Sequence, residues 1–129
     1  MVIKEVQAII EKYIEAYNSF EIESMVQLLH KDIIFRNISN TETTTETRGI
    51  AAFRELAEQS STMFSSRRQT ITGYSDSVIN DEIEVEIDYE GVLAMNLPNG
   101  LKKGDKLQLK GKSKFGIKEG KILLIEDYS

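Results

Sequence analysis

The spacing of apolar residues along this chain changes from the period of a helix to the period of a strand. As far as residue 64, most apolar positions recur every three or four residues, which predicts amphipathic helices. Beyond about residue 68, apolar and polar residues alternate, which predicts strands with one apolar face. This order predicts an α+β fold, and 129 residues are the length of a single domain spanning 1–129.

The first predicted helices are separated by a short polar turn, and His30 lies at the end of the second helix. A cationic side chain is favoured at that place by the helix dipole, so we interpret His30 as structural. The predicted elements are helical stripes over 3–20, 22–29 and 50–64, a strand near 32–38, a polar segment at 41–47, and strands near 68–79, 82–97, 105–117 and 121–128.

Charged residues alternate with apolar residues in two of the predicted strands. Acidic residues occupy every second position of 82–90, and lysines recur at even positions of 106–114. An antiparallel pairing that matches the acids with the lysines places Glu90 opposite Lys110, Asp88 opposite Lys112 and Glu86 opposite Lys114. We interpret these charges as a solvated face. A self-complementary charged face also suits a homodimer formed through the sheet.

The same pairing leaves small side chains on the inward, apolar face of the sheet. Gly111 and Ser113 lie there beside Tyr89, where a filled core would need bulkier residues. A two-residue turn at 80–81 brings Tyr74 onto the same face. Because buried tyrosine hydroxyls need hydrogen-bond partners, this pattern predicts a partly polar cavity between the curved sheet and the helices.

Two segments of the chain resemble one known superfamily. KYIEAYNSFEIESMVQLLHKDIIF is similar to the first helices and strand of ketosteroid isomerases and SnoaL-like polyketide cyclases. FGIKEGKILLIEDY resembles the final hairpin of SnoaL-like proteins and limonene epoxide hydrolases. The resemblance is to the nuclear transport factor 2-like, or cystatin-like cone, superfamily. It implies three N-terminal helices packed in the concave face of a curved, mostly antiparallel sheet, a fold that serves enzymes, transport factors and binding modules alike.

The resemblance to ketosteroid isomerases carries over only part of their site. Tyr13 matches the tyrosine that donates a hydrogen bond to the developing oxyanion, and Tyr17, one turn later, is predicted to line the same cavity. The aspartate base of the isomerases corresponds to Asn37, and a neutral amide cannot accept a proton at ordinary pH. Their second, protonated aspartate corresponds to Gly111. The resemblance therefore argues against steroid isomerisation, but it keeps a pocket and one hydrogen-bond donor.

Asp127 is the candidate acid or base, because it matches an aspartate near the end of limonene epoxide hydrolases. A two-residue turn at 119–120 would turn Glu126 inward, whereas a three-residue loop at 118–120 would turn Asp127 inward. The resemblance favours the longer loop. The other charged groups of the epoxide hydrolases have no match, since their positions correspond to Glu90 and Val92.

An aspartate held in an apolar cone would have a raised pKa, and it could then act as acid or base. Tyr13, Tyr74 or Asn37 would orient the ligand. The predicted site is thus Tyr13 and Asp127 as catalytic residues, with the ligand-binding residues Tyr17, Asn37, Tyr74, Tyr89 and Ser113.

Composition excludes several other kinds of site. The chain has no cysteine, so it can form neither a disulfide framework nor a thiolate zinc site, and its single histidine lacks companions for a metal. We predict no metal and no cofactor. A net charge of −5 argues against nucleic acid, because a basic face could come only from the pair Arg67 and Arg68 and the C-terminal lysines. No apolar run reaches the roughly 20 residues of a membrane span, and MVIKEVQAII lacks the pattern of a signal peptide, so we expect a cytoplasmic protein.

Three functions are compatible with this sequence. The first, which the amide at Asn37 favours, is a SnoaL-like binding protein for a small hydrophobic or cyclic molecule. The second is an enzyme of this fold, an isomerase, polyketide cyclase, dehydratase or hydrolase, that uses Asp127 as acid or base and Tyr13 as hydrogen-bond donor. The third is a protein interaction module that uses the outer face of the sheet.

Overall fold

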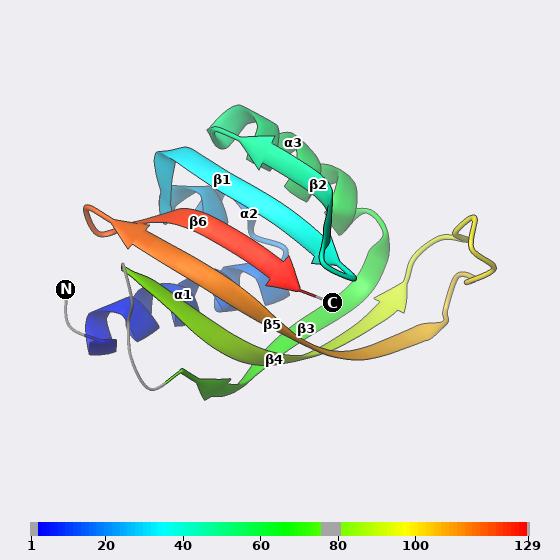
Figure 1. The fold of residues 1–129 in the computed structure, drawn as a ribbon. Coiled ribbons are helices and arrows are strands. Elements are labelled where there is room, and N and C mark those ends of the chain that lie inside the picture. The colour runs from blue at the N-terminus through cyan, green and yellow to red at the C-terminus, as the bar shows by residue number, and fades with distance from the viewer. Residues whose placement is uncertain (1–2, 76–80, 129) are drawn as a thin grey trace.

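The computed structural model describes residues 3–75 and 81–128, and it shows three helices on one face of a curved sheet of six strands (Figure 1). The elements, in chain order, are α1 (Ile3–Asn18), α2 (Ile22–Gln27), β1 (Leu29–Ser39), β2 (Glu42–Arg48), α3 (Ile50–Ser61), β3 (Phe64–Tyr74), β4 (Glu82–Leu93), β5 (Lys106–Lys118) and β6 (Lys121–Tyr128). The strand order is β2-β1-β6-β5-β4-β3, and every pair is antiparallel except β1 with β6. The predicted α+β fold, with a mostly antiparallel sheet, is confirmed.

The core lies between α1 and the inward face of the sheet. Val6, Ile10 and Ile14 recur at helical spacing, and all three are buried. On the sheet side, the alternation in β4 buries Ile83 and Val85 almost completely. Burial of each such side chain stabilises the fold by about 1.5–3 kcal/mol. The apolar face of α1 and the apolar face of β4 together hold the helix against the sheet. No helix of the described residues is long and apolar enough to cross a membrane.

The predicted helix-end role of His30 is wrong. Helix α2 ends at Gln27, and His30 is the second residue of β1, where its side chain is buried. Its Nδ1 accepts a hydrogen bond from the backbone N–H of Asp32 at 3.0 Å. Helix α2 ends early because the chain pairs with β6 from Leu28 onward. The N–H of Ile122 donates to the Leu28 carbonyl at 2.9 Å, and Leu29 pairs with Ile122.

Two further element boundaries differ from the prediction. The polar segment 41–47 is mostly the edge strand β2, whose four threonines have high strand propensity. Helix α3 stops at Ser61, and Phe64 belongs to β3 rather than to the helix. The hydroxyls of Ser61 and Thr62 each donate to a carbonyl three residues earlier, which helps to end the helix before the aromatic residue.

The predicted register of β4 with β5 is wrong by two residues. The structure pairs Asp88 with Lys110, Glu86 with Lys112 and Glu84 with Lys114. A slip of two residues keeps every side chain on its face and again places three acids opposite lysines, so charge alternation alone could not distinguish the two registers. The pairs are exposed, and each contributes little stability.

The register of β3 with β4 also differs from the expected one. Tyr74 pairs with Val85 instead of Ile87, and Ile87 pairs with Ile71. Of the predicted turn at 80–81, position 80 lies outside the described residues, and Asp81 has a φ of 61°.

A bulge in the last hairpin decides which acid faces inward. The turn is the two-residue one, with Glu119 at φ 54° and Gly120 at φ 76°, both in the left-handed region that such turns need. The register then shifts, since Gly116 pairs with Leu124 whereas Ile117 pairs with Ile122. Leu123 is the extra residue, and a bulge reverses the faces of the residues after it. Asp127 therefore points inward despite the short turn.

Candidate functional site

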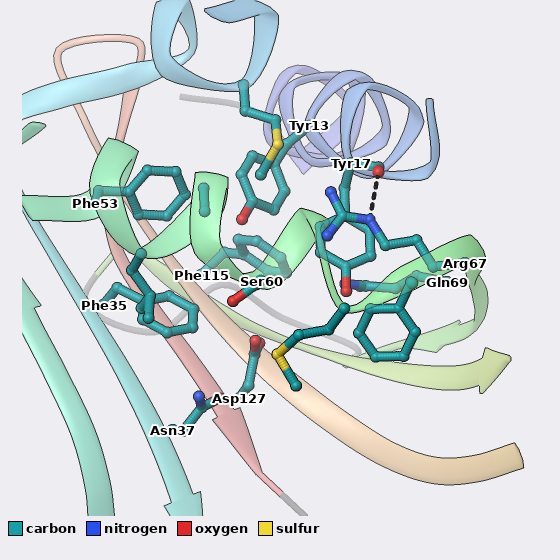
Figure 2. A pocket seen from close by; sticks show the side chains of 15 residues that line it. Tyr13, Tyr17, Phe35, Asn37, Phe53, Ser60, Arg67, Gln69, Phe115 and Asp127 are labelled. Atoms are coloured by element: carbon teal, nitrogen blue, oxygen red, sulfur yellow. Dashed lines mark hydrogen bonds between the residues drawn. The ribbon is translucent and has the colours of Figure 1, made fainter. Parts of the chain in front are cut away.

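The concave side of the sheet holds a cavity of about 190 Å³, closed mainly by α1 and α3 (Figure 2). Its walls are largely apolar, with Phe35 and Phe53 in edge-to-face contact at a centroid distance of 5.9 Å. The polar side chains among its lining residues are Tyr13, Tyr17, Asn37, Ser60, Arg67, Gln69 and Asp127. A small apolar volume with a few convergent polar groups is the usual form of a ligand site.

Asp127 enters this cavity from β6, and its only hydrogen-bond partner among the described side chains is Ser113. The Ser113 hydroxyl donates to Oδ1 of Asp127 at 2.6 Å. Burial raises the pKa of Asp127 to about 6, against the lowering effect of the Ser113 hydrogen bond. Neither an arginine nor a lysine of the described residues forms an ion pair with it. A carboxyl with such a pKa can exchange its proton near neutral pH.

Tyr13 reaches the cavity from α1, on the side opposite Asp127 (Figure 2). Its ring packs edge-to-face on Phe115 at a centroid distance of 5.9 Å and leaves the residue only 4% exposed. No described residue forms a hydrogen bond with its hydroxyl. Burial, and next the charge of Asp127, raise the pKa of Tyr13 well above its ordinary value. The phenol therefore keeps its proton and can donate it in a hydrogen bond to a ligand.

Asn37 and Asp127 are neighbours in register on the parallel strands β1 and β6. Both line the cavity, because side chains paired in register project to the same face of a sheet. The Asn37 carbonyl accepts a hydrogen bond from Thr44, but its side-chain amide has no partner among the described residues. The cavity thus has an amide where an isomerase-like base is expected and a carboxyl one strand away.

A second hollow of about 230 Å³ adjoins the first and shares four of its lining residues, Tyr17, Asn37, Gln69 and Asp127. Ser113 and Tyr89 line this second hollow. The Tyr17 hydroxyl donates to the Tyr89 hydroxyl at 3.2 Å. The structure therefore brings six of the seven predicted site residues together around Asp127.

Tyr74 is the exception, and its expected place in the cavity needs correction. Its hydroxyl donates to Oε1 of Glu11 at 3.3 Å, on a part of α1 that is outside both hollows. In the observed register Ile71, and not Tyr74, lies opposite Ile87, and Tyr74 lies opposite Val85.

Arg67, like Ser60 and Gln69, is a polar cavity residue that was not predicted from the sequence. It is only 5% exposed, and its Nε donates to the Tyr17 carbonyl at 3.0 Å. The sequence suggested it only with Arg68, as part of a basic surface. The alternation in β3 does contain the signal: Ile71 faces the core, and Gln69 and Arg67 lie two and four residues before it on the same face.

The family is decided by a match along most of the chain. The profile of the SnoaL-like domain matches residues 10–125. The chain belongs to the SnoaL-like domain family. No curated protein is significantly similar to it in sequence.

Solved structures give this SnoaL-like domain the nuclear transport factor 2-like, ketosteroid isomerase-like fold. A proposed polyketide cyclase from Xanthomonas campestris pv. campestris has a TM-score of 0.79 at 18% identity, over 98% of this chain and 90% of that one. An LEH-like epoxide hydrolase from Mycobacterium tuberculosis has a TM-score of 0.75 at 14% identity, over 97% and 82%. A protein from Catenulispora acidiphila, solved with trimethylamine, has a TM-score of 0.74 at 14% identity, over 94% and 84%. At such identities the likeness is one of fold.

The SnoaL-like domain has no further acid beside Asp127 among the described lining residues of the cavity. Glu90, one of the two positions that correspond to charged groups of the epoxide hydrolases, is exposed and pairs with Lys106 at 3.0 Å. Among residues 3–75 and 81–128, no group of three histidine or carboxylate side chains could hold a metal ion. The chemistry open to the cavity is therefore that of one carboxyl, two phenols, one serine hydroxyl, two amides and one guanidinium.

Proposed function

We propose that this protein is an enzyme that moves a proton on a small carbonyl compound, with Asp127 as the acid or base. The observation that carries the proposal is the Asp127 carboxyl, whose pKa is raised to about 6 by burial, in a cavity that also holds the free hydroxyl of Tyr13. A general base is most effective when its pKa lies near the working pH.

The proposed step uses both groups and needs no co-reactant. The Asp127 carboxylate removes a proton from a carbon next to the carbonyl group of the substrate. The C–H electron pair becomes the C=C bond of an enolate, and the carbonyl π pair moves to oxygen. Tyr13 donates a hydrogen bond to that oxygen, and Asp127 returns the proton to a carbon of the same intermediate.

The neighbour relation of Asn37 and Asp127 supports this role. The two residues pair in register on adjacent strands, so a base on β6 can reach the same substrate carbon as an aspartate at position 37 of β1 would reach. The Asn37 amide can then orient the substrate by hydrogen bonding.

Binding without turnover is the second candidate. The observation in its favour is that two positions corresponding to isomerase aspartates are Asn37 and Gly111, neither of which can exchange a proton. A binding protein would use the same cavity for a small hydrophobic molecule, and a change of the Asp127 carboxyl would alter affinity rather than rate.

Deuterium exchange separates the two candidates, because it detects proton removal whatever the later steps are. Cyclohexanone, 2-cyclohexenone and 3-oxocyclohexanecarboxylate are incubated with the protein in D₂O at pD 7.5, and loss of the α-protons is followed by NMR. We expect exchange faster than in buffer, and a decrease of about 10²–10⁴-fold in Asp127→Asn. Tyr13→Phe should lower the rate by about 10²-fold.

Glu126→Gln is the matched control, since it removes a carboxylate one residue away whose side chain bonds Arg36 at 2.8 Å outside the cavity. It should leave the exchange rate unchanged. Exchange no faster than in buffer for all three ketones, or equal rates in the wild type and Asp127→Asn, would overturn the enzyme proposal.

A further inference from the structure

Arg67 is a buried cation without an anionic partner among the residues that the structure describes. Its exposure is 5%, and its Nη2 is completely buried with no hydrogen-bond partner among the described residues. No carboxylate of the described residues lies within ion-pair distance of its guanidinium. A buried charge is normally paired, so this arrangement is costly unless another group compensates it.

The contacts that Arg67 does make satisfy only part of the guanidinium. Nε donates to the Tyr17 carbonyl at 3.0 Å. The guanidinium carbon lies 3.7 Å from the centroid of the Tyr17 ring and 4.5 Å from that of Phe20. Cation–π contacts of this kind attract the charge, but they give no acceptor to the remaining N–H groups.

Arg67 also lines the cavity that contains Asp127 and Tyr13. Figure 2 shows its guanidinium beside Tyr17, on a different side of the cavity from the Asp127 carboxyl. Asp127 does not act as its counter-ion, since no ion pair joins the two groups and the hydrogen bond to the Asp127 carboxyl comes from Ser113. The positive charge does act on Tyr13, where Arg67 lowers the pKa in opposition to burial.

We propose that the ligand of this cavity carries a carboxylate, which Arg67 binds through its free N–H groups. This inference extends the proposed function, on which it rests for the reacting end of the ligand. A carboxylate fits one guanidinium, because its two oxygens match two parallel N–H groups. A cavity of about 190 Å³ has room for a single ring or a short branched chain beyond that group.

The positions of the charged groups then define how the ligand lies. Its carboxylate contacts Arg67, and its carbonyl oxygen and acidic carbon lie between Tyr13 and Asp127. A small keto acid has both features in one molecule. The guanidinium also favours negative charge near Tyr13, where the enolate oxygen develops.

The alternative is a purely structural role, in which Arg67 holds the turn after α1 against β3 through its contacts with Tyr17 and Phe20. The two roles differ in what a charge-removing substitution changes. If the role is structural, substitution of Arg67 would lower the stability of the fold and would leave the preference between charged and neutral ligands unaltered.

The test compares benzoate with benzamide, which have nearly the same size and shape but differ in charge. Affinities are measured by titration calorimetry at pH 7 in the wild type, Arg67→Gln, Arg67→Lys and Arg68→Gln. Arg68→Gln is the matched control, because it removes the same charge from the exposed neighbouring position of β3. Thermal unfolding of each variant reports its stability separately.

We expect the wild type and Arg68→Gln to bind benzoate about tenfold or more tightly than benzamide. Arg67→Gln should lose this preference, and Arg67→Lys should keep a part of it. Equal affinities for the two probes in the wild type, or no benzoate binding in the millimolar range, would overturn the inference even if Arg67→Gln failed to fold. A preference that survives in a folded Arg67→Gln would overturn it as well.

Asp127→Asn separates this inference from the proposed function. It should retain the preference for benzoate, since the carboxylate contacts Arg67 at another part of the cavity. Preference for benzoate together with absent deuterium exchange would reject the enzyme proposal and support the carboxylate site. Deuterium exchange without preference for benzoate would support the enzyme proposal and reject the carboxylate site.

Discussion

The Asp127 carboxyl gives this molecule a group whose charge depends on pH near neutrality. Burial raises its pKa from 3.8 to about 6, so the folded state favours the protonated form. The contribution of this group to stability is therefore fully present below pH 3.8, and it is lost as the pH rises through about 6. Above that pH the protein retains an ionised carboxylate in an unfavourable place, which is the state that a general base requires.

Asp127→Asn tests this trade between stability and function. At pH 7.5 the variant should be more stable than the wild type by about 1–2 kcal/mol, because the amide has no charge to bury. The difference should disappear near pH 4, where Asp127 is protonated in the folded protein. Thermal unfolding between pH 4 and pH 8 measures it. A variant that is less stable than the wild type across this whole range would show that the carboxylate is stabilising rather than strained.

At the scale of elements, the hairpin of β5 and β6 holds the carboxyl in place. Gly111 lies on β5, where an added Cβ would come within 2.6 Å of the Tyr128 carbonyl oxygen on β6. Because the obstacle is backbone, β6 would have to move at the residue next to Asp127. The close approach of the two strands therefore requires a glycine at position 111.

Gly111→Ala should destabilise the protein by about 1–3 kcal/mol and lower proton exchange through displacement of Asp127. Lys110→Ala, at the exposed neighbouring position, should change the free energy of unfolding by less than about 0.5 kcal/mol. Denaturant unfolding of both variants measures the difference. Equal stabilities for the two variants would mean that β6 yields without cost, and the proposed positioning role of Gly111 would then be wrong.

The same hairpin shows why the inward face of β6 could not be read from the turn alone. The sequence of the hairpin is compatible with a two-residue turn that has Glu126 inward and with a three-residue loop that has Asp127 inward. The structure has the short turn and yet has Asp127 inward, because the bulge at Leu123 restores the second pattern. The choice depends on the fit of Ile122 and Ile125 into the core, both of which are buried, and no local turn rule contains that information.

At the scale of the whole molecule, the change from helical to strand period was sufficient to predict the α+β fold. The pattern did not predict the strand register or the burial of single polar side chains, because both depend on how the strands and helices pack against one another. The register of β4 with β5 differs by two residues, which conserves face and charge. Arg67 was overlooked because an arginine pair suggests a basic surface, whereas the strand turns one member of the pair into the core.

The outer face of the sheet carries the charge ladder, and a homodimer through this face remains a prediction. Pairs such as Lys106 with Glu90 and Lys112 with Glu84 are exposed there. If charged faces of two copies meet, static light scattering should show a dimer at low salt that dissociates as salt screens the charges. A monomer at low salt would contradict the prediction.

The measurement that tests the central claim most directly is the titration of the Asp127 carboxyl by ¹³C NMR, with Asp127→Asn used to assign its signal. We predict a pKa of about 6 in the wild type. We also predict a higher pKa in Ser113→Ala, because the hydrogen bond from Ser113 favours the carboxylate. A pKa near the ordinary 3.8, unchanged by Ser113→Ala, would contradict the claim, since Asp127 would then be a solvated carboxylate and not a base held in an apolar cavity.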